Sequence, residues 1–389
     1  MSRGRGTLRR LAGSWPGSAS AVRALLARGA AIGAFPGAVA RWGRPGGRVL
    51  TVAVGRRGLT RNREPVTADL VYDLASLTKL LVTTSLAMIF FSRGRLDLDQ
   101  PLAGGPLGPA LGGRGSEADW NRLTPSHLLA HQSGLRAWRP FYRLAGQGAE
   151  ERRALALEAL RTEIPVAGPG ELTLYSDLNF LLLGFLLEEI GGAALDALFD
   201  RELAGPLGLA GTGFRPGPGS VLAPTEDGFR YGGPVGDPGA DIKGPTPLGR
   251  PHDDNAAWLG GVAGHAGLFA PAAGAWAIAG DWSLAWRLGR GLVFERRALA
   301  RFLRPVPDRT GPGRPLGFNR PASAPEAAVG HLGYTGTSLW WAPDRDFLWL
   351  LLTNRVHPRA VNPAWRPADY GPVFAAGNWP ARPFPGGRR

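Results

Sequence analysis

Cysteine is absent from this sequence of 389 residues, and lysine accounts for only two of its 45 basic residues. The absence of cysteine excludes disulfides, thiolate zinc sites and a cysteine nucleophile, although it does not fix the cellular compartment. The two lysines are Lys79 and Lys243, and every other basic residue is arginine. Arginine stays charged in proteins whereas lysine can lose its proton, so a lysine at position 79 could supply a base that arginine could not.

Long hydrophobic segments are also missing. The longest apolar stretch, Leu80 to Phe91, is about 12 residues long, which is too short to span a bilayer. The basic N-terminus, MSRGRGTLRR, is not followed by an uncharged apolar segment, because Arg23 and Arg28 interrupt it. We therefore expect no secretory signal, no membrane partner and a cytoplasmic location, with a misassigned start codon as the main alternative.

The positive charge is large but dispersed. A formal net charge of +14 would suit a nucleic-acid-binding protein if the basic residues were clustered. The arginines instead stand singly or in pairs, without a long basic run. We expect no nucleic-acid partner, and we interpret the arginine content as a compositional habit of the whole chain.

Strand patterns occur near both ends of the chain, and helical patterns lie between them. Residues 38–42 (AVARW) and 48–55 (RVLTVAVG) flank a Gly/Pro turn, and residues 338–342 (SLWWA) and 347–354 (FLWLLLTN) repeat that layout. Helical spacing is found in residues 19–30, 80–91, 150–161 and 179–190. The pattern predicts an α+β fold, in which one antiparallel sheet is built from both termini and a mainly helical lobe is inserted between its halves.

This layout predicts a single main domain over residues 19–357. Its sheet lobe would comprise about residues 19–95 and 265–357, and its helical lobe about residues 96–264. Residues 358–389 are rich in proline and are predicted to form a C-terminal extension that wraps the surface.

A serine and a lysine lie three positions apart in LASLTK, residues 74–79. If this segment is helical, Ser76 and Lys79 share one face, with their Cβ atoms about 5–6 Å apart. A serine hydroxyl is a poor nucleophile until a base takes its proton. A lysine whose pKa is lowered by desolvation can be that base. The alternative is a solvated surface lysine, but the surrounding sequence, ASLTKLLVTTSLAMIF, is markedly apolar.

Two further segments could complete such a site. YSDLNF places Tyr175 and Asp177 just before a helical pattern, and GHLGYTGTSLWW occupies residues 330–341. The glycines of the second segment would let a strand edge come close to a ligand, and its backbone N–H groups could hold an oxyanion.

In this order, the segments resemble the serine β-lactamase and penicillin-binding-protein superfamily. The chain looks most like the class C β-lactamase-related group, which includes esterases and D-amino-acid peptidases. The resemblance covers roughly residues 20–357 and implies a β-lactamase/transpeptidase-like fold. It rests on LASLTK at 74–79, LLAHQSGL at 128–135, YSDLNFLLLG at 175–184, GGVAGHAGLF at 260–269, and GHLGYTGTSLWWAPD with LLTNRVHP within 330–358.

The resemblance implies a catalytic role for each matching residue. Ser76 would be the acylated nucleophile and Lys79 its base partner. Tyr175 would pass the proton to the leaving group and then activate water. The backbone N–H groups of Ser76 and Tyr334 would form the oxyanion hole. No metal and no cofactor are expected.

The predicted substrate-binding residues are Asp177, His331, Gly333 and Thr335, and two of them depart from the β-lactamase pattern. The second motif of that pattern usually ends in asparagine, but here it ends in Asp177, whose charge would favour the protonated form of Lys79. His331 stands where the family has the lysine of a Lys-Thr-Gly strand, and a neutral imidazole attracts a substrate carboxylate far less. Both changes favour less anionic esters and amides over β-lactams.

Other polar residues allow a structural or a functional interpretation. His127 and His131 have the spacing of a helical metal pair, but no third ligand is evident, so core hydrogen bonding is preferred. The run from His252 to Asp254 is interpreted as a loop brace rather than as catalytic. His265 is expected to be buried with its hydrogen bonds satisfied.

Three more positions allow either a structural or a functional interpretation. Asn179 could supply the amide that Asp177 lacks, although on a helix it would face differently. Of Trp340 and Trp341, strand alternation allows only one on the ligand side. Signatures of other hydrolases, such as G-x-S-x-G and H-E-x-x-H, are absent from the sequence.

The sequence therefore predicts a serine hydrolase that acts by acylation of Ser76 and deacylation on a small ester, amide or lactam. The alternative is a penicillin-recognising or ligand-binding protein on the same scaffold with little or no turnover. The only predicted partner is a small-molecule substrate, and the oligomeric state is left open.

Overall fold

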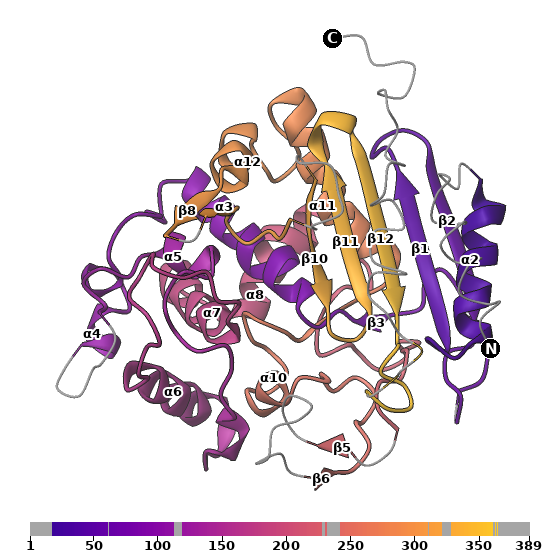
Figure 1. Cartoon of the computed structure of the whole chain (residues 1–389), viewed down its shortest axis with the longest axis horizontal. Coiled ribbons are helices and arrows are strands. Elements are labelled where there is room, and N and C mark those ends of the chain that lie inside the picture. The colour runs from indigo at the N-terminus through magenta and orange to yellow at the C-terminus, as the bar shows by residue number, and fades with distance from the viewer. Residues whose placement is uncertain are drawn as a thin grey trace.

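A five-stranded antiparallel sheet joins the two ends of the chain. The computed structural model describes residues 18–60, 62–112, 119–227, 230–231, 242–309, 311–320, 328–360, 362 and 364. The strand order is β10-β11-β12-β1-β2, so strands from the C-terminal part pair directly with strands from the N-terminal part (Figure 1). The strands are β1 (Gly37–Gly43), β2 (Val49–Gly55), β10 (Val329–Gly333), β11 (Thr337–Ala342) and β12 (Phe347–Thr353).

The predicted hairpins are both present and set the register of the sheet. In the first, Ala38 of β1 pairs with Val54 of β2, and in the second, Ala342 of β11 pairs with Phe347 of β12. The two hairpins join where β1 runs antiparallel to β12. These findings confirm the predicted α+β fold with a sheet made from both termini.

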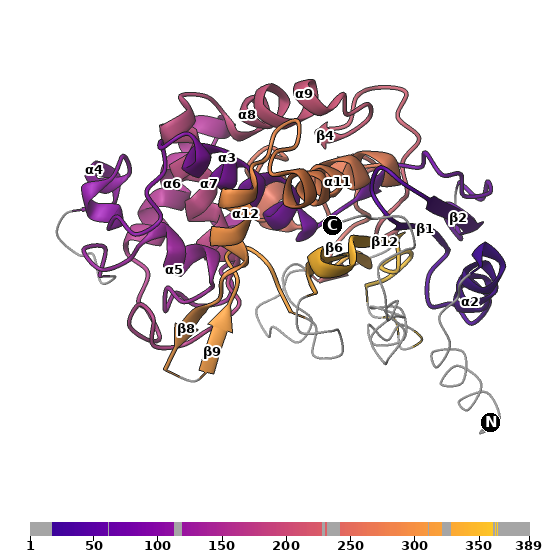
Figure 2. The ribbon, with the colours of Figure 1, turned by 90° about the horizontal axis from the view of Figure 1, so that it is seen from above.

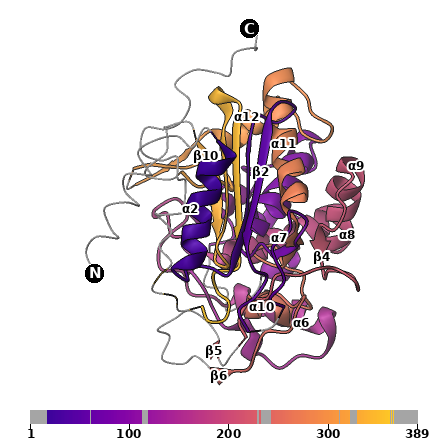
Figure 3. The same cartoon turned by 90° about the vertical axis from the view of Figure 1, so that its right-hand side faces the viewer.

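Helices cover the two faces of this sheet. Helix α2 (Ala19–Ala31) lies on one face and α11 (Ala272–Leu288) on the other, as the views in Figures 2 and 3 show. The face under α2 carries Trp42 and Trp349, whose ring centroids are 5.6 Å apart. Burying aromatic side chains on both sides fixes the sheet between two apolar layers.

Trp340 and Trp341 belong to these layers and not to the ligand site. Alternation along β11 places Trp340 in the core on the α2 side and Trp341 in the core on the α11 side. Both are at most 1% exposed. The expectation that one of them faces the pocket is therefore wrong, because both faces of this strand are covered.

The remaining helices form the mainly helical region between the sheet halves, and they confirm the helical patterns of the sequence. The helix that carries Lys79 begins with a π-helical segment, Lys79–Thr84, and continues as α3 (Ser85–Ser92). The others are α4 (Gly108–Leu111), α5 (Pro125–Leu129), α6 (Gly148–Arg161), α7 (Asp177–Gly191), α8 (Leu195–Phe199), α9 (Gly205–Leu207), α10 (Asp254–Trp258) and α12 (Arg296–Leu303).

Small sheets connect this region to the main sheet. The order β3-β7-β4 forms one of them, and β5 pairs with β6 and β8 with β9. These strands are β3 (Tyr72–Asp73), β4 (Gly213–Phe214), β5 (Arg230–Tyr231), β6 (Ile242–Lys243), β7 (Leu268–Ala270), β8 (Val306–Asp308) and β9 (Gly311–Arg314). β3 leads straight into the segment that holds Ser76, which therefore starts from a fixed strand.

Most of the predicted C-terminal extension, residues 358–389, lies outside the described residues. The boundaries proposed for the two lobes stay predictions. Within the described part of the chain, no single helix is long and apolar enough to cross a membrane. By length and composition alone, α7 and the following stretch Leu195–Leu207 pass that test together, as a pair bent by 70°.

Candidate active site

Ser76 follows a residue with an unusual backbone conformation. Ala75 has a φ of 46°, in the left-handed region, which costs a non-glycine residue about 1–3 kcal/mol. Its N–H donates to Asp73 Oδ1 at 2.8 Å, and Thr78 Oγ1 donates to its carbonyl at 2.7 Å. These bonds hold the sharp turn between β3 and the helix, and Ser76 remains half-buried beside it.

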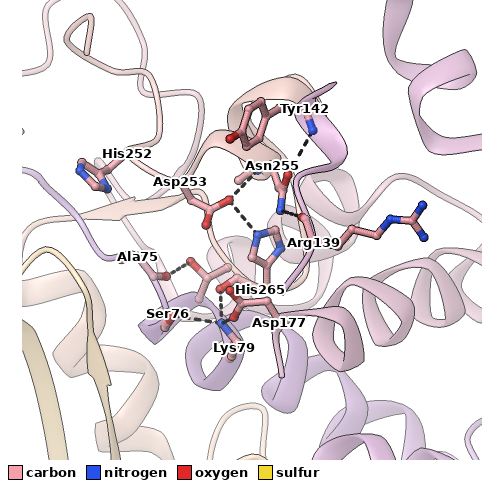
Figure 4. Close-up of polar contacts among 12 residues, drawn as sticks. Ala75, Ser76, Lys79, Arg139, Tyr142, Asp177, His252, Asp253, Asn255 and His265 are labelled. Carbon is pink, nitrogen blue, oxygen red and sulfur yellow. Dashed lines mark hydrogen bonds and ion pairs between the residues drawn. The ribbon is translucent and has the colours of Figure 1, made fainter. Parts of the chain in front are cut away.

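Lys79 is fully buried and lies within reach of three oxygen atoms. Its Nζ is 3.0 Å from Ser76 Oγ and 2.9 Å from the His265 carbonyl oxygen. The Asp177 carboxylate is 2.7 Å away and completes the set, as Figure 4 shows. The structure thus brings together Ser76, in the turn before the helix, and Lys79, in the helix that follows, as their spacing predicts.

The charge of Lys79 differs from the expectation drawn from the sequence. Burial lowers the pKa of the Lys79 ammonium group, but the Asp177 carboxylate and Tyr175 raise it further, so the net shift is upward. Lys79 is therefore protonated here and is not a free base beside the serine. The reason is that the carboxylate at 2.7 Å and Tyr175 together outweigh the loss of solvation, which is the largest single effect.

Tyr175 lies against the same pair. Its hydroxyl makes side-chain hydrogen bonds with Ser76 and Lys79, and its ring centroid is 5.3 Å from Lys79 Nζ. Tyr175 keeps 38% of its surface exposed because it lines the pocket, whereas its hydroxyl faces the buried ammonium. Burial raises the pKa of this hydroxyl, and the opposing effect of Lys79 does not reverse the rise. Tyr175 therefore lies within hydrogen-bonding reach of both Ser76 and Lys79.

Asp177 begins α7 and faces Lys79, while Asn179 faces elsewhere. The Asp177 N–H donates to the Ala137 carbonyl at 2.8 Å, which ties α7 to the loop opposite. Asn179 is fully buried and accepts a hydrogen bond from Ser133 Oγ through Oδ1. Since Asn179 does not line the pocket, it does not supply the amide that is missing at Asp177.

The segment after β10 closes the other side of the site. Tyr334 lines the same pocket as Ser76, so the two residues predicted to supply the oxyanion hole border one cavity. Gly333 lets this strand approach the nucleophile turn, because an added Cβ would lie 2.5 Å from the Leu74 carbonyl oxygen and 2.0 Å from Thr337 Oγ1. Thr335 is 1% exposed and donates to the Asp73 carbonyl at 2.7 Å. Gly333 and Thr335 thus hold the two segments together, and neither lines the pocket.

His331 is also placed behind the pocket wall and not in it. It is 4% exposed, its Nδ1–H donates to the Leu332 carbonyl at 2.7 Å, and its ring centroid is 5.8 Å from that of Tyr175. Burial, with smaller effects of the nearby positive charges of Lys79 and Arg314, lowers the pKa of His331 to about 3. The imidazole is therefore neutral at ordinary pH. Its position gives no support to the predicted direct contact with substrate.

A pocket of about 280 Å³ lies over Ser76. This volume suits a small molecule or one end of a longer one. Its walls come from six separate segments of the chain. The lining residues are Ala75, Ser76, Ala137, Trp138, Tyr175, Asp177, His252, Asp253, Asp254, Ala266 and Tyr334.

His252, Asp253 and Asp254 line this pocket, although the sequence suggested a loop brace for them. The bracing contacts exist as well, because Asp253 Oδ1 caps α10 by accepting from the Ala256 N–H at 2.8 Å. His265 is buried as expected, with Nε2 2.8 Å from Asp253 Oδ1, but its Nδ1 has no hydrogen-bond partner. The only sequence feature that could have indicated their place in the pocket is the run of three polar residues in a Gly/Pro-rich region.

A cation site has some geometric basis in this cluster. Ligand atoms of Asp177, Asp253 and His265 lie within 4.8 Å of one another. However, Asp177 already pairs with the Lys79 ammonium and Asp253 with the His265 imidazole. Because Lys79 already neutralises Asp177 and the His265 imidazole already contacts Asp253 Oδ1, we keep the prediction that no metal takes part.

The histidine pair of the sequence is used for hydrogen bonding. His127 Nδ1 lies 2.9 Å from Thr124 Oγ1 in the capping box of α5. His131 Nδ1 accepts from the Ser176 N–H at 3.0 Å, and its ring packs on Tyr175 with centroids 4.6 Å apart. His131 therefore supports the Tyr175 segment from behind.

Comparisons with known proteins agree with this geometry. The family model described as Beta-lactamase matches residues 22–370. A relative from Salmonella heidelberg (strain SL476), named as a D-alanyl-D-alanine carboxypeptidase, is 28% identical over 340 residues, which are 82% of this chain and 76% of the relative.

Two solved structures are also similar to this chain over most of its length. SurE is 26% identical, with a TM-score of 0.66 over 92% of this chain and 74% of that chain. EstCE1, a hydrolase with promiscuous acyltransferase activity, is 21% identical, with a TM-score of 0.67 over 91% of this chain and 95% of that chain. The second likeness concerns the fold alone. Since the family model spans most of its length, this chain belongs to the beta-lactamase family and is a serine hydrolase of that superfamily.

Proposed function

We propose that Ser76 is acylated by a small ester or amide and that water then releases the acyl group. The contact of 3.0 Å between Lys79 Nζ and Ser76 Oγ, at a pocket that Tyr175 and Tyr334 also line, is the observation that supports this assignment. It joins a nucleophile, a proton relay and a binding space in one place.

The steps follow from the positions of these groups. Ser76 Oγ attacks the carbonyl carbon, its proton enters the Lys79–Tyr175 pair, and the backbone N–H groups of Ser76 and Tyr334 hold the oxyanion. The same proton passes to the departing oxygen or nitrogen, which leaves an acylated Ser76. Water then attacks the carbonyl carbon of the acyl group while the Lys79–Tyr175 pair takes its proton. The bond from that carbon to Ser76 Oγ breaks, the proton returns to Ser76, and the carboxylic acid leaves. Because Lys79 starts protonated, the pair must lose a proton first, so the rate should rise with pH.

Asp177→Asn tests this account of the proton relay. The Asp177 charge raises the pKa of both Lys79 and Tyr175, so its removal lowers both. We expect the ascending limb of the pH–rate profile to move to lower pH, whichever of the two groups accepts the proton. A limb that moves by one pH unit raises the rate on its acid side about tenfold. We also expect nitrocefin turnover to increase. An unchanged pH profile of p-nitrophenyl butyrate hydrolysis would contradict the account.

Burst kinetics separate a hydrolase from a slow acyl acceptor. The Asp177–Lys79 ion pair is the observation that favours a slow acyl acceptor, because it opposes proton transfer to Lys79 during both acylation and deacylation. We expect many turnovers of p-nitrophenyl acetate or butyrate per enzyme molecule. A single stoichiometric burst would instead indicate a protein that is acylated but hardly deacylated.

Substrates with a carboxylate beside the scissile bond should be poor. β-Lactams and peptides ending in D-alanyl-D-alanine, the type of substrate named for the Salmonella relative, carry such a group. The described lining residues include three aspartates and neither lysine nor arginine. We therefore propose neutral or cationic esters and amides as the substrates of this pocket.

A further inference from the structure

One wall of the pocket is acidic. Asp177, Asp253 and Asp254 all line it, yet Lys79 pairs only with Asp177. Carboxylates that face an enclosed space around a nucleophile impose a negative potential on whatever enters it. Such a potential favours a positively charged group over a negatively charged one.

Asp253 is a fixed carboxylate. Its Oδ1 accepts from the Ala256 N–H at 2.8 Å and lies 2.8 Å from His265 Nε2, so the contacts in Figure 4 converge on one oxygen. Burial raises the pKa of Asp253, but its contacts with His265 and Ala256 lower it more, and the carboxyl stays ionised. Its second oxygen can accept a further hydrogen bond without disturbing these contacts.

The wall is also close to the reacting atoms. The carboxylates of Asp253 and Asp177 belong to the cluster whose ligand atoms lie within 4.8 Å of one another. Asp177 is in turn 2.7 Å from Lys79 Nζ, which is 3.0 Å from Ser76 Oγ. A group bonded to Asp253 would therefore lie only a short distance from a carbonyl held at Ser76.

The start of α10 cannot easily move away from this position. Asn255 Nδ2 donates to the Arg139 carbonyl at 2.8 Å, and its Oδ1 accepts from the Tyr142 N–H at 3.2 Å. These two bonds clamp the aspartates of α10 to the loop that carries Trp138, another lining residue. The wall is preorganised for a ligand and does not depend on induced movement.

Positive groups near the site offset this wall only in part. Lys79 pairs with Asp177 and also lowers the pKa of Asp253, but it brings one charge against three aspartates. Arg314 acts on His331 and Tyr175, and Arg355 lies 4.7 Å from the Tyr334 ring centroid, but neither guanidinium lines the pocket. His331, at the position where a family lysine would attract a carboxylate, is buried behind Tyr175. The cationic side of the family's site is thus absent from the described lining, and an acidic side is present.

We propose that Asp253 and Asp254 recognise a primary ammonium group of the substrate, so that the pocket selects amino-acid esters and amides with a free amine close to the scissile carbonyl. This proposal rests on the hydrolase function proposed for Ser76. The ammonium would donate to the free oxygen of Asp253 while the carbonyl carbon lies at Ser76 Oγ. N-acylated and carboxylate-bearing analogues would lose this bond, and the carboxylate would in addition meet like charge.

The test uses three substrates that differ only at the amine: alanine p-nitroanilide, its N-acetyl form and its N-succinyl form, each as both enantiomers. At pH 6.5 the free amine is protonated, and we expect its kcat/KM to exceed that of the N-acetyl form at least about tenfold. The N-succinyl form should be the poorest. A kcat/KM for either acylated form that equals or exceeds that of the free amine overturns the proposal.

Two variants test whether the acidic wall causes the preference for a free amine. Asp253→Asn keeps an acceptor for the helix cap, so α10 should stay in place. The ratio of kcat/KM for the free-amine anilide to kcat/KM for the N-acetyl anilide should fall close to one. The fall should come mainly from a higher KM for the free-amine anilide. The matched control, Asp344→Asn, changes an exposed aspartate between β11 and β12 and should leave the ratio as it is. An equal loss of kcat for both substrates in Asp253→Asn would mean a purely structural role and would refute the proposal.

Labelling of Ser76 by a fluorophosphonate separates a failure of the ammonium preference from a failure of the hydrolase function on which it rests. Absence of an adduct at Ser76 removes the hydrolase function and this proposal together. If Ser76 is labelled but alanine amide slows labelling no more than N-acetyl-alanine amide does, only the ammonium preference fails. This competition gives an answer even if every anilide is hydrolysed slowly.

Discussion

Ser76→Ala should lose hydrolysis of p-nitrophenyl butyrate by at least about 10⁴-fold while the protein stays folded. The variant removes the oxygen that attacks the carbonyl. It leaves Lys79 with the His265 carbonyl and the Asp177 carboxylate as partners, so no buried charge becomes unpaired. The thermal unfolding midpoint should therefore change little. Steady-state kinetics and circular dichroism check the two halves of this expectation.

Mass spectrometry after fluorophosphonate treatment identifies the nucleophile directly. The adduct should be found on the peptide with Ser76 and be absent in Ser76→Ala. Ser20→Ala, at an exposed serine of α2, serves as the control and should be labelled and active like the parent protein. If Ser76→Ala still hydrolyses the ester at a comparable rate, the acyl-enzyme mechanism is wrong for this chain.

Lys79→Arg should lose at least about 10³-fold in kcat/KM, although it keeps the positive charge. A guanidinium neither gives up a proton at accessible pH nor fits easily where the lysine is 0% exposed. The loss should appear mainly in kcat, because the pair acts during bond making and breaking. An arginine variant with the parental rate would show that only the charge at this position matters.

A second pair of variants separates the catalytic role of Lys79 from its contribution to stability. Lys79→Met alone leaves the largely buried Asp177 carboxylate without its partner, which should lower the free energy of unfolding by about 3 kcal/mol. Adding Asp177→Asn removes the unpaired charge and should recover much of that loss in urea unfolding. Activity should stay lost in the double variant. Recovered activity would mean that Lys79 has only a structural role.

The sequence alone was sufficient for the elements whose causes are local. Alternating apolar residues predicted both hairpins, and helical spacing predicted α2, α6, α7 and the helix that carries Lys79. The contact between Ser76 and Lys79 follows from their separation by three positions across the turn that leads into one helix, which needs no tertiary information. The order of the motifs was enough for the family, which the family model confirms.

Only the tertiary structure decided how the site is charged and what it faces. Lys79 is protonated because Asp177, which is distant in sequence, lies 2.7 Å away. His331 is neutral and outside the pocket because the β10 segment is covered. Asp253 and Asp254 line the pocket with Ser76 because the start of α10 is held at the loop opposite through Asn255. The physical reason is common to all three: pKa values and pocket walls depend on burial and on charges from distant segments. A pattern of residues along the chain carries neither quantity.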